Sequence, residues 1–104
     1  MGTLSIFYFS RIIILLSEVV VGEYQMTIGE ALSQRVNELL EEKGITQYRL
    51  SILSGVSQAS IGDIRHIRNK TVNIGLINAI AQGFEMDLAT FFDSPLFRGE
   101  NITD

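Results

Sequence analysis

Residues 27–92 form a series of short amphipathic segments, each preceded by a residue type that caps helices. Side chains of Ser, Thr, Asn and Asp accept hydrogen bonds from the free N–H groups in the first turn of a helix. Glycine often ends a helix in the left-handed conformation, as we predict for Gly44 and Gly55. The predicted caps are Thr27, Thr46, Ser57, Asn73 and Asp87. The chain is therefore predicted to be all-α, with five helices joined by short turns.

Apolar residues recur at helical spacing within these segments and predict the buried faces. The first segment is predicted to bury Ile28, Leu32, Val36, Leu39 and Leu40. The fourth is predicted to bury Ile74, Ile77, Ile80 and Ala81, and the fifth Leu88, Phe91 and Phe92. Glu30 lies three residues after Thr27, the spacing of a capping box. Pro95 is expected to end the fifth helix, because proline has no N–H to donate.

The composition excludes several classes of functional site. The chain has 104 residues, no cysteine and one histidine, so neither a disulfide framework nor a thiolate zinc site is available. It offers no pair of nucleophile and base and no phosphate-binding glycine loop. We therefore predict a protein that is not an enzyme and uses no cofactor, metal or small-molecule ligand. A reducing cytoplasm fits the lack of cysteine.

The charge is unevenly distributed along the chain. The net charge is −4, which is unusual for a protein that contacts phosphates. Between Ile45 and Gln82, however, four basic residues and one acidic residue give +3, whereas the other 66 residues give −7. A basic patch is therefore predicted within an acidic protein.

Residues 46–66 have the spacing of a helix-turn-helix, in which two short helices cross at a steep angle. Counted from Gln47, the fourth, tenth, fifteenth and eighteenth positions are apolar, as a shared core requires: Leu50, Val56, Ile61 and Ile64. Ser51 is small at the fifth position, and Gly55 permits the turn at the ninth. The second of these helices is predicted to run from about 57 to 66.

The sequences ITQYRLSILSGVSQASIGDI (45–64) and NKTVNIGLINAIAQGFEMDLATFF (69–92) resemble the Cro and phage-repressor-like helix-turn-helix regulators. The resemblance covers residues 28–92. It implies a lambda-repressor-like domain in which the helix at 57–66 lies in the major groove of double-stranded DNA and reads base edges. Gln58 suits the N6 and N7 edge of adenine, Ala59 a thymine methyl group and Asp63 a cytosine amino group.

The residues that the resemblance places at DNA fall into two sets. Base contacts are predicted for Ser57, Gln58, Ala59, Gly62, Asp63 and His66. Phosphate contacts are predicted for Thr46, Gln47, Arg49, Ser60, Arg68, Asn69 and Lys70. Two positions depart from the family pattern. Ile67 stands where glycine is common, although a β-branched residue avoids positive φ, and Gly62 weakens its helix by about 1 kcal/mol relative to alanine.

Residues 1–25 form an apolar N-terminal extension, in which Arg11 and Glu18 are the charged residues between Leu4 and Val21. A transmembrane helix is disfavoured because Arg11 in its middle costs roughly 2.5–3.5 kcal/mol. A signal peptide is disfavoured because no basic residue precedes Leu4. The segment is interpreted either as one that caps the domain or pairs across a dimer, or as sequence upstream of a true start at Met26.

The sequence thus predicts a helix-turn-helix domain at 26–94, followed by a C-terminal tail at 95–104. The favoured function is a cytoplasmic, sequence-specific transcriptional regulator that binds DNA as a homodimer, because one short helix reads few bases. The alternative is a protein-interaction module on the same fold, such as an antitoxin or adaptor. The acidic first helix and the apolar N-terminus favour this alternative.

Overall fold

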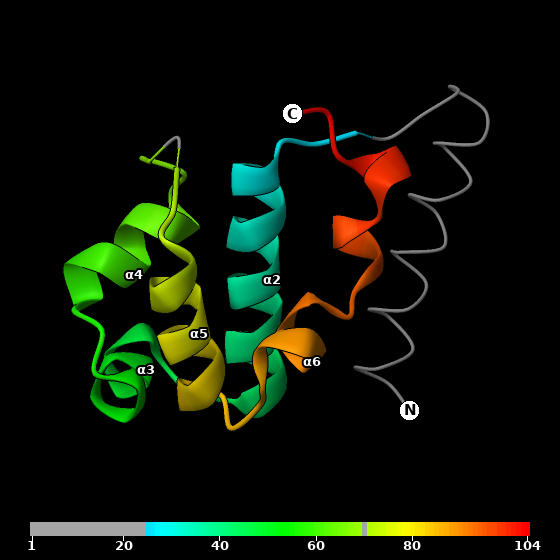
Figure 1. The fold of residues 1–104 in the computed structure, drawn as a ribbon. Coiled ribbons are helices and arrows are strands. Elements are labelled where there is room, and N and C mark those ends of the chain that lie inside the picture. Colours follow the sequence, from blue (N-terminus) through cyan, green and yellow to red (C-terminus); the bar gives the residue numbers. More distant parts are fainter. Residues whose placement is uncertain (1–24, 70) are drawn as a thin grey trace.

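Figure 1 shows the computed structural model, which describes residues 25–69 and 71–104. The α-helices in this part of the chain are α2 (Ile28–Lys43), α3 (Gln47–Ser54), α4 (Gln58–Arg65), α5 (Ile74–Gly83) and α6 (Leu88–Phe92). Two 3₁₀ helices follow, η1 (Pro95–Phe97) and η2 (Gly99–Asn101). The prediction of an all-α fold with five helices is confirmed for these residues. The interpretations of the apolar segment 4–21 concern residues outside the described part.

The predicted caps begin all five helices. The accepting side chains and their backbone donors are Thr27 with Glu30, Thr46 with Arg49, Ser57 with Ser60, Asn73 with Gly75 and Leu76, and Asp87 with Thr90. The capping box at Thr27 is complete, because the Glu30 carboxylate accepts from the Thr27 N–H. Gly44 and Gly55 end their helices with φ values of 66° and 75°, the left-handed conformation that glycine adopts without strain.

The helices enclose one main core. Its side chains come from α2, α3, α4, α5 and α6, together with Val56 in the turn between α3 and α4 and Phe84 directly after α5. Phe84 and Phe91 are the largest fully buried side chains. In Figure 1, α2 passes through the middle of the molecule, with α4 and α5 on one side and the 3₁₀ helices on the other. This arrangement leaves the outer surfaces of α3 and α4 uncovered.

The tightest helix contact joins α3 and α5. A Cβ atom added to Gly83 would lie 2.7 Å from the Cβ of Ser54 and 3.1 Å from its Cα. Both distances are shorter than ordinary carbon–carbon contacts, which are about 3.5–4.0 Å. The two backbones therefore approach each other closely because residue 83 has no side chain.

Two predictions of burial were wrong. Ile28 is 37% exposed and Ile74 is 60% exposed. Each is the first residue of its helix, so its side chain lies at the end of the helix, beyond the layer against which later turns pack.

The helical end predicted at Pro95 also differs. Helix α6 ends at Phe92, and Pro95 instead begins η1, a position that suits proline because the first N–H of a helix has no partner.

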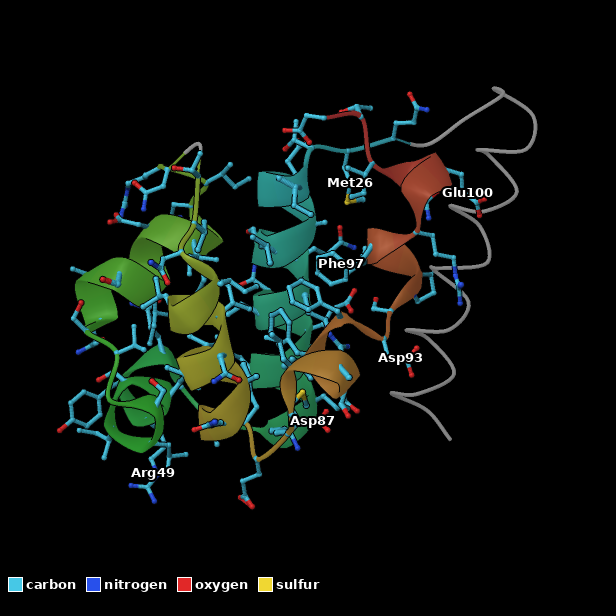
Figure 2. The ribbon with its side chains drawn as sticks, in the orientation of Figure 1. Met26, Arg49, Asp87, Asp93, Phe97 and Glu100 are labelled. Atoms are coloured by element: carbon cyan, nitrogen blue, oxygen red, sulfur yellow. The ribbon has the colours of Figure 1, made fainter. Side chains whose placement is uncertain are left out.

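Residues 95–104, the predicted tail, fold back on the start of α2. Leu96 is buried with Met26 and Ala31 in a second apolar cluster. Met26 N–H donates to the Asn101 carbonyl at 2.9 Å, and its carbonyl accepts from Thr103 N–H at 2.9 Å. Figure 2 shows Met26 and Phe97 on the side of α2 that faces these turns. The Asp104 carboxylate accepts from the Ile28 N–H at 2.7 Å and so adds a cap to α2.

Arg35 connects α2 to α6. Its guanidinium donates to the Phe91 carbonyl at 2.7 Å and to the Thr90 carbonyl at 3.0 Å, near the end of α6. The same guanidinium lies 5.8 Å from the centre of the Phe91 ring. Arg35 therefore supplies donors to two carbonyl groups at the end of α6, of which the Thr90 carbonyl also accepts from the Asp93 N–H.

The cap at Asp87 predicts a pH effect. Hydrogen bonds from the side chain and backbone N–H of Thr90 hold the pKa of the Asp87 carboxyl below its ordinary value. Because the pKa is lower in the folded state, the cap stabilises the protein above about pH 4 and is lost as the pH falls through the folded-state pKa. In Asp87→Asn, which retains an oxygen acceptor, thermal unfolding from pH 6 to pH 2 is expected to depend less on pH than in the wild type. An unchanged pH dependence would contradict this assignment.

No helix within residues 25–69 and 71–104 combines the length and the hydropathy needed to cross a membrane.

Candidate nucleic-acid interface

Helices α3 and α4 form the predicted helix-turn-helix. The shared core is confirmed, since Leu50, Val56, Ile61 and Ile64 are each at most 7% exposed. The α3 helix ends at Gly55, and the chain reaches α4 through Val56 and the cap at Ser57. Packing of α2 against α4 and of α5 against α3 holds the pair from behind.

The first turn of α4 presents three predicted base-contact residues to solvent. Ser57, Gln58 and Ala59 are exposed, and His66 is exposed at the other end of the helix. The Ser57 hydroxyl accepts from the Ser60 N–H and donates to the Ser60 hydroxyl at 3.0 Å. The side chains of Gln58 and Ala59 take no part in this cap.

The structure differs from the expectation at Gly62, which is buried. A Cβ atom at this position would lie 3.5 Å from the Gln47 Nε2 atom and 3.8 Å from the Arg68 Nη1 atom. These two side chains therefore lie across α4 at the point where Gly62 has none. A base contact through Gly62 would require both side chains to move aside.

Asp63 and Arg68, predicted as a base contact and a phosphate contact, bind each other. The Arg68 guanidinium lies 3.1 Å from the Asp63 carboxylate, and the two side chains are 59% and 35% exposed. An ion pair this exposed contributes at most about 1 kcal/mol to stability. The Arg68 side chain can therefore exchange this partner for a phosphate at little cost.

Gln47, the predicted phosphate contact at the start of α3, uses both ends of its carboxamide within the protein. The oxygen accepts from Arg65 Nη1 at 2.9 Å, and the nitrogen donates to the Gln58 carbonyl at 3.1 Å. The backbone N–H groups of Gln47 and Tyr48 have no hydrogen-bond partner among the described residues. The N-terminus of α3 thus carries free donors and a partial positive charge.

The other predicted phosphate contacts within the described residues belong to α3, to α4 and to the segment after α4. Thr46 caps α3, and Arg49 is exposed beside it, at the outer edge of the molecule in Figure 2. Ser60 is half-buried in α4 and Asn69 is exposed beyond it. Lys70 lies outside the described residues.

Sequence reasoning missed the role of Arg65, which it treated only as a positive charge. The Arg65 Nε atom donates to the Asn37 Oδ1 atom at 2.5 Å, in addition to the bond to Gln47. The Arg65 carbonyl accepts from the buried Ser33 hydroxyl at 2.6 Å. No spacing in the sequence pairs α2 with the end of α4, so these contacts had no local signal.

The family model for Cro/C1-type helix-turn-helix DNA-binding domains matches residues 35–95, more than half of the chain. The chain belongs to this family. No curated protein matches the sequence. Among solved structures, the prophage Lp1 protein 11 is 27% identical with a TM-score of 0.61, over 68% of this chain and 93% of that one.

A second solved structure is an HTH_3 family transcriptional regulator from Vibrio cholerae. It is 25% identical to this Cro/C1-type chain, with a TM-score of 0.57 over 62% of the chain. The match spans 35% of the length of the Vibrio protein. The family match and these two structures agree with the resemblance found in the sequence.

In this Cro/C1-type domain, residue 67 after α4 has a left-handed backbone conformation even though it is isoleucine. Ile67 has a φ of 56°, so the turn has the backbone conformation that glycine would adopt there. For an L-residue with a side chain this conformation costs roughly 1–2 kcal/mol. The Ile67 side chain lies close to Gly29, with its Cγ2 atom 3.4 Å from where a Cβ of residue 29 would be.

Two substitutions separate strain from packing at Ile67. Ile67→Gly and Ile67→Ala both remove the contact with Gly29, but only glycine removes the strain. We expect Ile67→Gly to be more stable than Ile67→Ala by about 1 kcal/mol, the reverse of the order within a helix. Chemical denaturation of the two variants measures this difference. A more stable alanine variant would show that the turn does not require positive φ.

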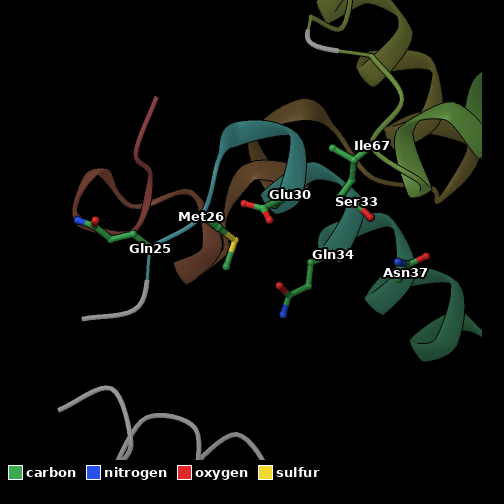
Figure 3. A pocket seen from close by; sticks show the side chains of 7 residues that line it. All are labelled: Gln25, Met26, Glu30, Ser33, Gln34, Asn37 and Ile67. Carbon is green, nitrogen blue, oxygen red and sulfur yellow. The ribbon is translucent and has the colours of Figure 1, made fainter. Parts of the chain in front are cut away.

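A shallow hollow of about 440 Å³ lies beside this turn, between Ile67 and α2 (Figure 3). Five of the seven residues that line it are polar. The lining consists of Gln25, Met26, Glu30, Ser33, Gln34, Asn37 and Ile67. Within residues 25–69 and 71–104, no group of three His, Cys, Asp or Glu side chains could hold a metal ion.

Proposed function

We propose that this Cro/C1-type domain is a sequence-specific transcriptional regulator that inserts the first turn of α4 into the major groove of DNA. The observation that carries the proposal is that Gln58 and Ala59 are exposed on α4 while free N–H donors lie at the start of α3. The two side chains suit base edges, and the N–H donors suit a phosphate. Thr46, Arg49, Arg68 and Asn69 are exposed and would supply further phosphate donors.

The proposed site concentrates positive charge in an acidic protein. Repulsion between DNA and the acidic remainder favours one orientation, in which α3 and α4 face the phosphates. We further propose that two copies bind a two-fold symmetric site, because the first turn of one helix reads few base pairs. We also propose that a regulator of this kind acts in the cytoplasm.

Fluorescence anisotropy tests the proposal. Duplexes selected from a random pool and unrelated duplexes would be titrated with the full chain between 50 and 200 mM salt. We expect a tighter complex with the selected sequence, and a log affinity that falls with log salt by about 0.9 per phosphate contacted. Arg68→Ala is expected to weaken both complexes alike and to reduce this slope by about one. No binding of any duplex at low salt would exclude DNA recognition.

A protein-interaction module is the second candidate function. The observation in its favour is the outer face of α3, where Tyr48, Ile52 and Leu53 are 46–58% exposed. Exposed apolar side chains that cluster on one helix often mark a protein contact. The module would become the better proposal if the anisotropy titrations detected no DNA binding.

A further inference from the structure

A chain of hydrogen bonds crosses from α2 through the end of α4 to the start of α3. Asn37 of α2 accepts from the Arg65 guanidinium, the guanidinium donates to the Gln47 oxygen, and the Gln47 nitrogen donates to the Gln58 carbonyl. The backbone of Arg65 is held as well, since its carbonyl accepts from Ser33 of α2. Arg65 is thus fixed to α2 by its side chain and by its main chain.

These contacts determine which way the Gln47 carboxamide points. A guanidinium only donates, so it accepts no bond from an NH₂ group and selects the carboxamide oxygen. A carbonyl only accepts, so the Gln58 carbonyl selects the carboxamide nitrogen. The two neighbours therefore favour the same orientation of the side chain. An NH₂ group has two hydrogens, and the bond to the Gln58 carbonyl uses one of them.

The second hydrogen of this NH₂ group has no partner among the described residues. Because the backbone N–H groups of Gln47 and Tyr48 are also free, the first two residues of α3 carry three free donors at a helix end that is already positive. With the carboxamide reversed, an oxygen would take the place of the third donor and repel a phosphate.

We propose that Arg65 is a positioning residue for DNA binding, which orients the Gln47 carboxamide so that it presents a donor to a backbone phosphate. This inference rests on the proposed function. Arg65 itself is half-buried, and its guanidinium already donates to Asn37 and to Gln47. Its effect on affinity therefore passes through Gln47 rather than through its own charge.

The main test compares Arg65→Met with Arg35→Met. Both substitutions remove a half-buried guanidinium with two hydrogen bonds, and Arg35 is a matched control because it ties α2 to α6 instead. At a temperature where both variants are folded, Arg65→Met is expected to bind the selected duplex about ten-fold more weakly, which corresponds to about 1.4 kcal/mol, with an unchanged salt slope. Arg35→Met is expected to bind within about two-fold of the wild type.

A second variant keeps the test informative if Arg65→Met does not fold. Gln47→Glu retains an acceptor for Arg65 but has no side-chain donor, and it places an oxygen where the NH₂ group was. We expect it to fold and to bind the selected duplex at least about ten-fold more weakly than the wild type. Where Arg65→Met does fold, adding it to Gln47→Glu is expected to cause little further loss, because the two residues act through one group.

Several outcomes would overturn the inference. A salt slope reduced by about one in Arg65→Met would make Arg65 a direct phosphate contact. Equal losses in Arg65→Met and Arg35→Met would reduce its role to general stability. Without DNA, the NMR signals of the Gln47 NH₂ group should change in Arg65→Met but not in Arg35→Met. This last measurement is independent of the proposed function, so an unchanged Gln47 signal rejects the positioning role even for a protein that binds no DNA.

Discussion

Gly83→Ala is expected to lower the free energy of unfolding by about 2 kcal/mol, because overpacking of this kind typically costs 1–3 kcal/mol. The added Cβ would lie 2.7 Å from the Ser54 Cβ and 3.1 Å from the Ser54 Cα, so part of the obstruction is backbone that no rotamer change relieves. Helices α3 and α5 would have to separate. This cost exceeds the gain of about 1 kcal/mol that alanine brings to a helix.

Thermal and urea denaturation measure the effect, which corresponds to a fall in Tm of roughly 8–16 °C for a domain of this size. Gly62→Ala is the matched control, since its added Cβ would lie at ordinary contact distances of 3.5 and 3.8 Å from its neighbours. We expect that variant to be more stable than the wild type by about 1 kcal/mol. Ser54→Gly should partly restore the Gly83→Ala protein. If both alanine variants were stabilised, the close contact at Gly83 would be refuted.

Gln58→Ala is expected to abolish discrimination at one base pair of the selected duplex, with a loss of about 1–3 kcal/mol on that sequence and little loss on others. The side chain of Gln58 is exposed, and the contact with Gln47 uses the Gln58 carbonyl, which alanine retains. The stability of the domain should therefore change by less than about 0.5 kcal/mol.

Anisotropy with duplexes that differ at single positions measures this prediction. Gln34→Ala is a suitable control, because Gln34 is an exposed glutamine on α2, outside the proposed interface. That variant should bind every duplex as the wild type does. A Gln58→Ala protein that lost affinity equally for all duplexes would make Gln58 a phosphate contact.

The sequence predicted the helices well because the signals for their ends are local. Each cap lies within three residues of the N–H groups that it binds, so Thr27 or Asp87 can be recognised without knowledge of the fold. The core of the helix-turn-helix was equally accessible, since its spacing is fixed by two helices and one turn. Burial at helix ends was less accessible, because it depends on how far a neighbour covers the first turn, and Ile28 and Ile74 are only partly covered.

The candidate interface was only partly predictable for the same reason. The exposure of Gln58 and Ala59 follows from helical periodicity. The burial of Gly62 does not, because it depends on side chains from α3 and from the turn after α4. The contacts of Arg65 join residues 18 and 28 positions apart, and periodicity within one helix says nothing about them. Arg65 and Gly83 both required the packing of helices to be known.

The contact between Met26 and residues 101–103 links the two ends of the described chain. Asp104 and Ile28, which lie beside it, are 76 positions apart in sequence. Closing a loop of this length costs chain entropy. Among the described residues, the second apolar cluster that offsets this cost locally is small: it buries Met26, Ala31 and Leu96, with Phe97 and Ile102 partly buried against them. This contact between the chain ends should therefore form late in folding and open first, so that its amides exchange with solvent while the helix-turn-helix stays closed. The helix-turn-helix and the contact between the chain ends would then be separate cooperative units.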